Sequence, residues 1–143
     1  MMEMKTIAQN LKAVQNSLPK QQNIKIVVVT KTRTPKEIEE AIAAGARFIG
    51  ENRVQEAENK FSKIKNIDLV EKRLIGRLQT NKVNRAVKIF DVIDSVDSPR
   101  LASKISKAAQ RQHKKQRVLI QVNSSGETTK AGFNLKDKKS IIE

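Results

Sequence analysis

The sequence contains no cysteine, tryptophan or tyrosine among its 143 residues, and only one histidine. Without cysteine the chain can form no disulfide, no thiolate metal site and no thiol nucleophile, and nothing points to an oxidising compartment. The histidine, His113, has no partner at a metal-ligand spacing, so we expect no metal site and place His113 on the surface. The longest strongly apolar run, "IVVV" at 26–29, is far shorter than a membrane span. The default expectation is a cytoplasmic protein that does not enter a membrane.

Negative charge is also scarce, with 15 acidic against 29 basic residues and a formal net charge of +14. Such an excess of positive charge suggests nucleic acid or another polyanion as a binding partner. The basic residues are spread along the whole chain, however, and the aromatic side chains that stack on bases are limited to four phenylalanines. A lysine-rich solvated surface is the simpler interpretation, and nucleic-acid binding stays an alternative function.

Hydrophobic periodicity predicts alternating helices and strands. Helices are expected over 3–18, from Pro35 to about Gly45, from about Asn52, over 80–88, from Pro99 to about 112, and over 136–143. Strands are expected over 24–30, 47–50, 73–76, 89–96 and 117–123. The second helix has the strongest end signals, because Thr34 and Glu37 form a capping-box pattern and Gly45 suits a left-handed C-cap.

This alternation is typical of βαβ units, and therefore of an α/β protein with a parallel sheet. Five β/α units fit either a doubly wound sheet or the first part of a TIM-type (β/α)8 barrel, which needs about 250 residues when complete. Periodicity leaves both open. In either case we expect residues 1–143 to form a single domain. The two common glycine-rich nucleotide loops are absent from the sequence.

The segments that follow the predicted strands are all polar. They read "TKTRT", "GENRVQE", "GRLQTNK", "DSVDS" and "VNSSGETTKAG". Because the carboxyl ends of parallel strands meet at one edge, these amide, hydroxyl and cationic groups gather on one rim. Together they favour a small anionic ligand there.

Lys31 ends the most apolar strand of the chain. Strand alternation places it on the same face as Val27 and Val29, so in a barrel it lies at the mouth if those valines point inward. A lysine in an apolar, cation-rich pocket has a lowered pKa, and its free amine can form an imine with a carbonyl group. Arg33 would assist if it stays nearby. The alternative is a lysine that extends from the strand end into water.

Five segments carry a family resemblance. They are "VVVTKT", "FIGENRVQEAENK", "LIGRLQTNK", "DVIDSVDSPRLASKI" and "LIQVNSSGETTKAGF". In this order and at these separations the chain, from about residue 5 to residue 135, resembles the YggS/PROSC family of pyridoxal 5′-phosphate-binding proteins. Members of that family resemble the N-terminal barrel domain of alanine racemases. The resemblance therefore implies the N-terminal part of a (β/α)8 barrel with parallel strands.

The resemblance also implies the site. It makes Lys31 the residue that carries pyridoxal phosphate as a Schiff base, places Asn52 near the cofactor, and suggests that Gly76 lets backbone approach the ligand. The alternatives for Asn52 and Gly76 are a helix N-cap and a tight turn. A further group is expected to shape the rim without contacting the cofactor: Glu51, Gln55, Asn81 and Lys82.

The implied role is intracellular pyridoxal phosphate homeostasis, in which the protein buffers and delivers the cofactor, rather than robust catalysis. An amino-acid racemase needs a second acid/base opposite its lysine, for which alanine racemases use a tyrosine. This chain has no tyrosine. We therefore expect no enzyme activity and assign no catalytic residue.

The chain departs from the family pattern in two ways. Arg73 stands where the family has a histidine, which is expected to change the charge beside the cofactor site. The chain also stops after its fifth strand, so the resemblance implies a barrel truncated at its C-terminus, without the later strands that cradle the phosphate. Two open strand edges then favour a complementing C-terminal fragment or self-association. The alternative is a non-functional or split-gene fragment of the family.

Overall fold

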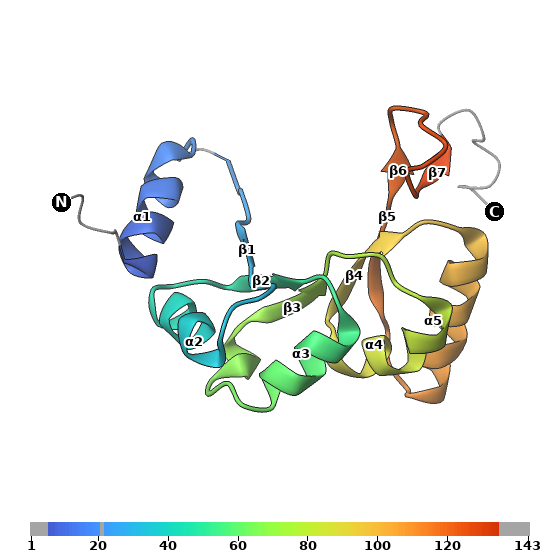
Figure 1. Ribbon diagram of the computed structural model, residues 1–143, viewed down its shortest axis with the longest axis horizontal. Helices are drawn as coiled ribbons and strands as arrows, with labels where there is room; N and C mark the ends of the chain where they lie inside the picture. Colours follow the sequence, from blue (N-terminus) through green and yellow to red (C-terminus); the bar gives the residue numbers. More distant parts are fainter. Residues whose placement is uncertain (1–5, 21, 135–143) are drawn as a thin grey trace.

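The structure, a computed structural model, describes residues 6–20 and 22–134. Helices and strands alternate along them as predicted (Figure 1). The elements are α1 (Ile7–Ser17), β1 (Val27–Val29), α2 (Pro35–Ala43), β2 (Phe48–Glu51), α3 (Val54–Phe61), the 3₁₀ turn η1 (Ile67–Leu69), β3 (Glu71–Leu74), the 3₁₀ turn η2 (Thr80–Lys82), α4 (Val83–Ile89), β4 (Val92–Val96), α5 (Pro99–Arg111), β5 (Arg117–Ile120), β6 (Val122–Asn123) and β7 (Phe133–Asn134).

The first five strands form one parallel sheet in the order β1-β2-β3-β4-β5. Each strand pairs with the next one along the chain, from Val27 opposite Phe48 to Val92 opposite Arg117. A doubly wound sheet reverses its strand order at a switch point, whereas a (β/α)8 barrel adds strands in sequence order. The unbroken order therefore favours the barrel arrangement that periodicity left open.

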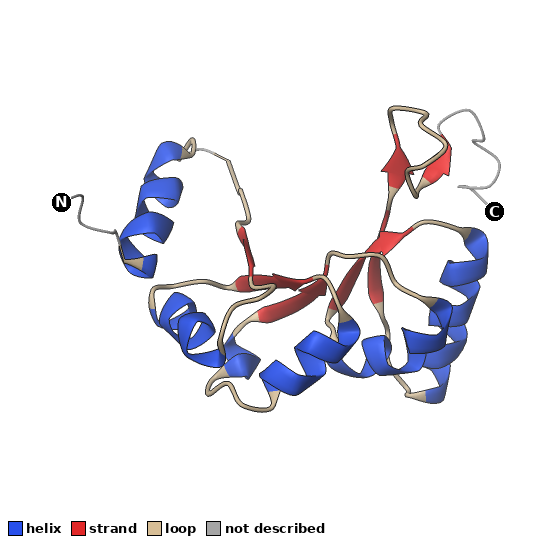
Figure 2. Cartoon of the chain, viewed as in Figure 1, coloured by secondary structure: helices blue, strands red, loops and turns tan. Residues whose placement is uncertain are grey.

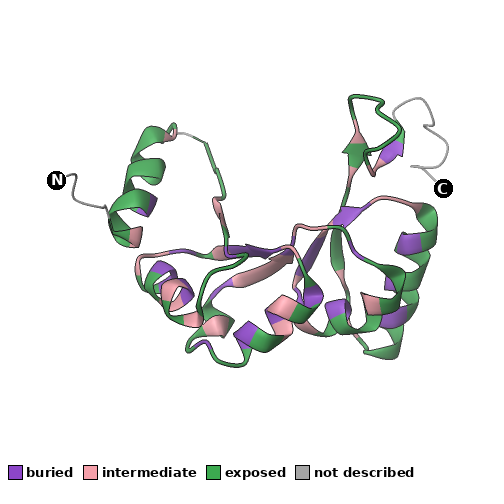
Figure 3. Cartoon of the chain, in the orientation of Figure 1, coloured by how far each residue is buried: buried purple, intermediate pink, exposed green. Residues whose placement is uncertain are grey.

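Helices α2 to α5 cover one face of this sheet (Figure 2). Their buried faces and the strand residues beneath them form the main core, which centres on large side chains such as Phe90, Ile49 and Leu74. The rings of Phe61 and Phe90 meet edge to face inside it. Burial is concentrated where helices meet the sheet (Figure 3). The opposite face of the sheet carries exposed apolar side chains, among them Val29 and Leu119.

Helix α1 packs separately, at the β1 edge of the sheet. Leu11 of α1 is buried with Ala41 and Ala46, and Val28 packs against this small cluster. Thr6 caps the helix through a reciprocal capping box with Gln9, which was not predicted. None of the helices in the described ranges is long and apolar enough to cross a membrane.

Most predicted elements are present, with shifted ends. The capping box of Thr34 and Glu37 is confirmed, and Gly45 has the predicted left-handed conformation with φ 101°. The predicted strand 89–96 starts later, since Ile89 ends α4 and the strand begins only at Val92. The predicted helix 80–88 divides into η2 and α4.

The predicted strand 117–123 also divides, into β5 and β6. Gln121 lies between them: its N–H donates to Val96 O at 2.8 Å, and its C=O accepts from the Phe133 N–H at 2.8 Å. This exchange of partners turns the chain into the small β6–β7 pair, which stands apart from the main sheet (Figure 1). The predicted helix 136–143, and residues 3–5 of the first predicted helix, lie outside the described residues.

Candidate functional site

Lys31 lies in a tight turn at the end of β1. The Thr30 N–H continues the sheet pairing by donating to Gly50 O at 2.9 Å, and the Arg33 N–H then donates back to Thr30 O at 3.1 Å. This bond closes a β-turn with Lys31 and Thr32 at its two central positions. Thr32 has φ 61°, in the left-handed region that non-glycine residues rarely adopt. Immediately afterwards, the Thr34 capping box starts α2.

The Lys31 side chain is exposed. Its ammonium group makes no hydrogen bond or ion pair with any residue in the described part of the chain. The two faces of β1 are divided as predicted, because Val28 packs against the α1 cluster while Val29 is 48% exposed. Lys31 is thus placed at the end of its strand with its amino group uncommitted. The described residues do not form an enclosing apolar pocket around it.

A second lysine, Lys60, forms hydrogen bonds with the backbone of this turn. Lys60, in the last turn of α3, is only 8% exposed. Its Nζ donates to Thr30 O at 2.7 Å and to Arg33 O at 3.3 Å, the carbonyls at the two ends of the Lys31 turn. The same ammonium is paired with two carboxylates, Glu51 at 2.6 Å and Glu56 at 2.8 Å. A buried charge is tolerated only with such partners.

Glu51 is completely buried, at the end of β2. Its Oε1 accepts from Thr30 Oγ1 at 2.7 Å and pairs with Lys60, while Oε2 has no partner among the described residues. The prediction that Glu51 shapes the rim is therefore wrong. Glu51 lies on the same strand face as Ile49, which belongs to the main core. Its side chain therefore points into the layer between the sheet and the helices.

Glu56, one turn before Lys60 on α3, completes this cluster. Its Oε1 accepts from the Thr32 N–H at 2.6 Å as well as from Lys60. The hydrogen bond from Lys60, followed by that from the Thr32 N–H, holds the pKa of the Glu56 carboxyl below its ordinary value. Sequence reasoning missed Thr30, Glu56 and Lys60. The signal that could have found two of them is the i,i+4 spacing of Glu56 and Lys60 on one helix face.

Asn52 and Gly76 lie directly against each other at the ends of β2 and β3. A Cβ built on Gly76 would lie 2.8 Å from Asn52 Cα and closer still to Asn52 O, so only glycine fits. The close approach is thus to the neighbouring strand end. The alternative role of Asn52 as a helix N-cap is wrong, because Arg53 is the N-cap of α3 and makes no side-chain capping bond.

Both residues line a surface cavity of about 540 Å³ between the β2–α3 and β3–η2 connections. Three cationic side chains surround it, those of Arg53, Arg77 and Lys82. Amide groups and the start of α3 complete the lining, which includes two of the predicted rim residues, Gln55 and Lys82. Lys31 is not part of this lining, so the structure places Asn52 and Gly76 together and Lys31 one strand away.

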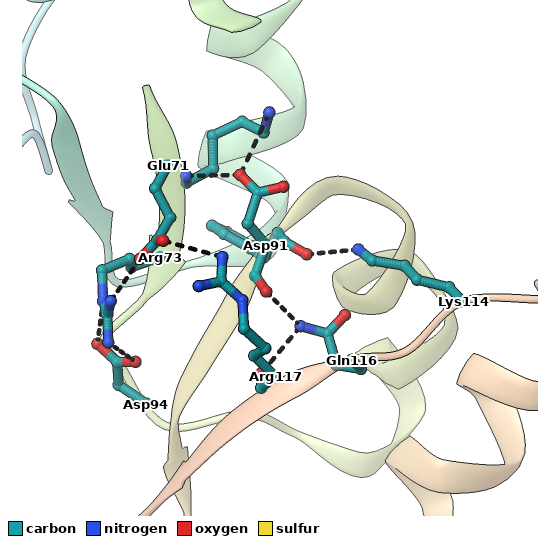
Figure 4. A network of polar contacts seen from close by, with 9 residues as sticks. Glu71, Arg73, Asp91, Asp94, Lys114, Gln116 and Arg117 are labelled. Carbon is teal, nitrogen blue, oxygen red and sulfur yellow. Dashed lines mark hydrogen bonds and ion pairs between the residues drawn. The ribbon is translucent and has the colours of Figure 1, made fainter. Parts of the chain in front are cut away.

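Arg73 does not leave an uncompensated charge beside the site. Leu74 is buried in the main core, so Arg73 lies on the opposite, uncovered face of β3. Its guanidinium donates to both oxygens of Asp94, at 2.9 and 2.8 Å, and pairs with Glu71 (Figure 4). The hydrogen bonds that the guanidinium donates to Asp94 are the main reason that the pKa of Arg73 is raised. The expected change of charge relative to the family stays a prediction, but the positive charge of Arg73 is paired here with two carboxylates.

The polar contacts continue across β5 and the segment before it (Figure 4). Arg117 pairs with the second oxygen of Glu71 at 2.9 Å, which ties β5 to β3. Lys114 donates to the carbonyls of Val87 and Phe90, both at 2.7 Å, and burial lowers its pKa. His113 is exposed, as predicted. Within the described ranges no cluster of three or more His, Cys, Asp or Glu could hold a metal ion.

Comparison with known proteins gives one matching family model, described as the alanine racemase N-terminal domain, over residues 2–143. The pyridoxal phosphate homeostasis protein of Aquifex aeolicus is 41% identical over 119 residues, which cover 83% of this chain and 52% of the relative. The chain spans about half the length of the curated relatives it matches.

Two solved structures of PipY from Synechococcus elongatus PCC7942 share the fold. The form without pyridoxal phosphate is 36% identical, with a TM-score of 0.86 over 92% of this chain and 60% of that chain. The form with pyridoxal phosphate bound is 33% identical, with a TM-score of 0.84 over 96% of this chain and 62% of that chain. An alanine racemase of Clostridium difficile 630, 19% identical, with a TM-score of 0.76 over 96% of this chain and 35% of that chain, shows the same fold. The predicted fold class, part of an alanine racemase-type barrel with parallel strands, is confirmed.

Proposed function

Because the chain belongs to the alanine racemase N-terminal domain family, we propose that it binds pyridoxal 5′-phosphate as a Schiff base on Lys31 and serves intracellular homeostasis of this cofactor. The curated relatives carry the name pyridoxal phosphate homeostasis protein, and PipY has been solved with pyridoxal phosphate bound. Both findings support the proposal.

The observation that carries it is the contrast between Lys31 and its surroundings. The turn around Lys31 is fixed by backbone hydrogen bonds and by Lys60 and Glu56 beneath it. The Lys31 ammonium, by contrast, has no described partner. A fixed backbone with an uncommitted amine is what imine formation with an aldehyde requires.

The residues at the neighbouring strand ends fit an anionic cofactor. Three cations line the cavity beside Asn52 and Gly76, and a positive lining of this kind attracts an anionic molecule. We propose Asn52 and Gly76 as cofactor-binding residues together with Lys31. Asn52 would supply an amide group to the cofactor, and Gly76 allows β3 to end close against β2. The bound cofactor would supply an electrophilic aldehyde carbon, and this chain supplies the amine.

Homeostasis is a better-supported role than catalysis. Curated relatives above 30% identity are named for cofactor homeostasis, whereas the alanine racemase is similar at 19% identity and informs only on the fold. The chain has no tyrosine to serve as a second acid/base. We therefore propose that Lys31 holds and releases the cofactor without turning over an amino acid.

Nucleic-acid binding finds no support in the aromatic residues. Phe61, Phe90 and Phe133 are buried, and Phe48 is half-buried beneath the Lys25 ammonium at 5.4 Å. Stacking on bases needs aromatic faces that are open to solvent. The excess of basic residues is therefore better assigned to surface solvation and to attraction of an anionic cofactor.

An absorbance titration with pyridoxal phosphate tests the proposal. We expect an imine band for the wild-type chain and for Lys36→Ala, which removes a nearby exposed lysine, but no band for Lys31→Ala. A band of equal intensity in Lys31→Ala would refute attachment at this residue.

A further inference from the structure

Lys60 occupies a position from which it can govern the reactivity of Lys31. We propose that Lys60 is a positioning residue: its buried ammonium fixes the turn that presents the Lys31 amine to the cofactor aldehyde. This inference rests on the proposed function, in which Lys31 forms the Schiff base. Lys60 itself contacts only protein groups, so its effect is exerted through the backbone.

The Lys60 ammonium contacts both ends of the Lys31 turn. Lys60 Nζ bridges Thr30 O at 2.7 Å and Arg33 O at 3.3 Å, the carbonyls on either side of the Lys31–Thr32 pair. Thr30 O also closes the turn by accepting from the Arg33 N–H. One ammonium group therefore ties both ends of the turn to α3. Motion of Lys31 relative to the sheet requires that these bonds break.

The middle of the turn is held by Glu56. Thr32 has φ 61°, a conformation that is unfavourable for a non-glycine residue and persists only when its surroundings enforce it. The enforcing contact is the bond from the Thr32 N–H to Glu56 Oε1 at 2.6 Å. Glu56 is in turn held by Lys60 at 2.8 Å. Loss of Lys60 would remove its bonds to both ends of the turn and, at the same time, the ion pair that holds Glu56 against the centre.

Lys60 and Lys31 differ in their surroundings and therefore in their chemistry. An ammonium group has three donors, and the Lys60 ammonium faces two carbonyls and two carboxylates, with only 8% of the residue exposed. Its donors are all taken up by these partners and the group is enclosed by protein, so it is not placed to act as a nucleophile. Lys31 is exposed and unpartnered among the described residues. In the reaction its neutral amine adds to the aldehyde carbon, and one water leaves as the C=N bond forms.

The test compares Lys60→Met with Lys114→Met in the full chain. Lys114 is a matched control, since it is a partly buried lysine that also donates to two backbone carbonyls, those of Val87 and Phe90. Amide hydrogen exchange at Thr32 needs no cofactor. We expect exchange in Lys60→Met to be at least about tenfold faster than in wild type, with no change in Lys114→Met.

The second readout is the rate of imine formation with pyridoxal phosphate. We expect it to fall about tenfold in Lys60→Met, because the amine no longer starts from one fixed geometry, and to be unchanged in Lys114→Met. If Lys60→Met fails to fold by circular dichroism, Glu56→Ala replaces it. That variant removes the Thr32 contact while leaving the Lys60–Glu51 pair in place.

The outcomes separate the two proposals. Faster Thr32 exchange with slower imine formation supports the inference. An unchanged imine rate, with or without faster exchange, overturns it and leaves the proposed function intact. A wild-type chain that forms no imine overturns the proposed function, and the Thr32 exchange then decides alone whether Lys60 fixes the turn.

Discussion

At the scale of single residues, the candidate site combines buried side chains that are held by ion pairs or close packing with one exposed side chain, Lys31, whose amine has no partner among the described residues. Glu51 and Lys60 are buried and form an ion pair with each other, so we assign them a structural role. Gly76 is constrained by packing, because any side chain there would overlap the backbone of Asn52. These constraints position the strand ends and leave Lys31 available for chemistry.

Gly76→Ala is the sharpest residue-scale test of this close approach. The added Cβ would fall 2.8 Å from Asn52 Cα, and backbone atoms have little freedom to move aside. We expect the free energy of unfolding in urea to fall by about 2 kcal/mol. Gly50→Ala is the control: its nearest neighbours are the ends of the Ile75 and Val27 side chains, and we expect a loss below about 1 kcal/mol. Equal losses would show that the Asn52–Gly76 contact is not tight.

At the scale of elements, polar contacts hold the strands together on the face that no helix covers. Arg73 joins β3 to β4 through Asp94, and Arg117 joins β5 to β3 through Glu71. The side chains of Arg73, Glu71 and Asp94 are each less than 20% exposed. Half-buried charges of this kind are stabilising only as a complete set.

Removing one member of the set should therefore cost more than removing an exposed pair. For Asp94→Ala we expect a loss of about 2 kcal/mol in chemical denaturation, because Arg73 loses two charge-assisted bonds. Lys130→Ala breaks an ion pair with Glu127 in which both side chains are more than half exposed, and we expect less than about 0.5 kcal/mol. A loss for Asp94→Ala no larger than that for Lys130→Ala would argue against a structural role for the network.

The elements also show which features the sequence could predict. The α2 helix was predicted with its cap because Thr34, Pro35 and Glu37 act on one another locally. The division of 117–123 at Gln121 depends on bonds to Val96 and Phe133, and no local pattern reveals such partners. The same holds for the site. Lys31 was predicted as the cofactor lysine from strand alternation and family resemblance, whereas the contact of Lys60 with the turn is a tertiary contact that joins the end of β1 to α3.

At the scale of the whole molecule, the sheet has two open edges. Strands β1 and β5 each pair with one neighbour in the described sheet. Apolar side chains on these strands are exposed, including Val29 at 48% and Leu119 at 51%. Open edges with apolar faces promote association with another chain. We propose that these edges are covered in solution, by a complementing segment or by a second copy.

Sedimentation measures this directly for the chain alone. We expect the average mass to rise above 16.1 kDa as the concentration increases, because a second copy covers apolar surface. Leu119→Lys places a charge on the β5 edge and should shift the curve toward the monomer. Lys130→Ala, which changes an exposed loop residue, should not. A wild-type chain that stays at monomer mass throughout would contradict the expectation.

The central claim is that Lys31 carries pyridoxal phosphate. Borohydride reduction of the complex, followed by peptide mapping, tests it most directly because reduction makes the imine permanent at the residue where it formed. We expect a single labelled peptide that contains Lys31, and we expect Lys60 to be unlabelled. Label spread over the exposed lysines, or found on Lys60, would contradict the claim.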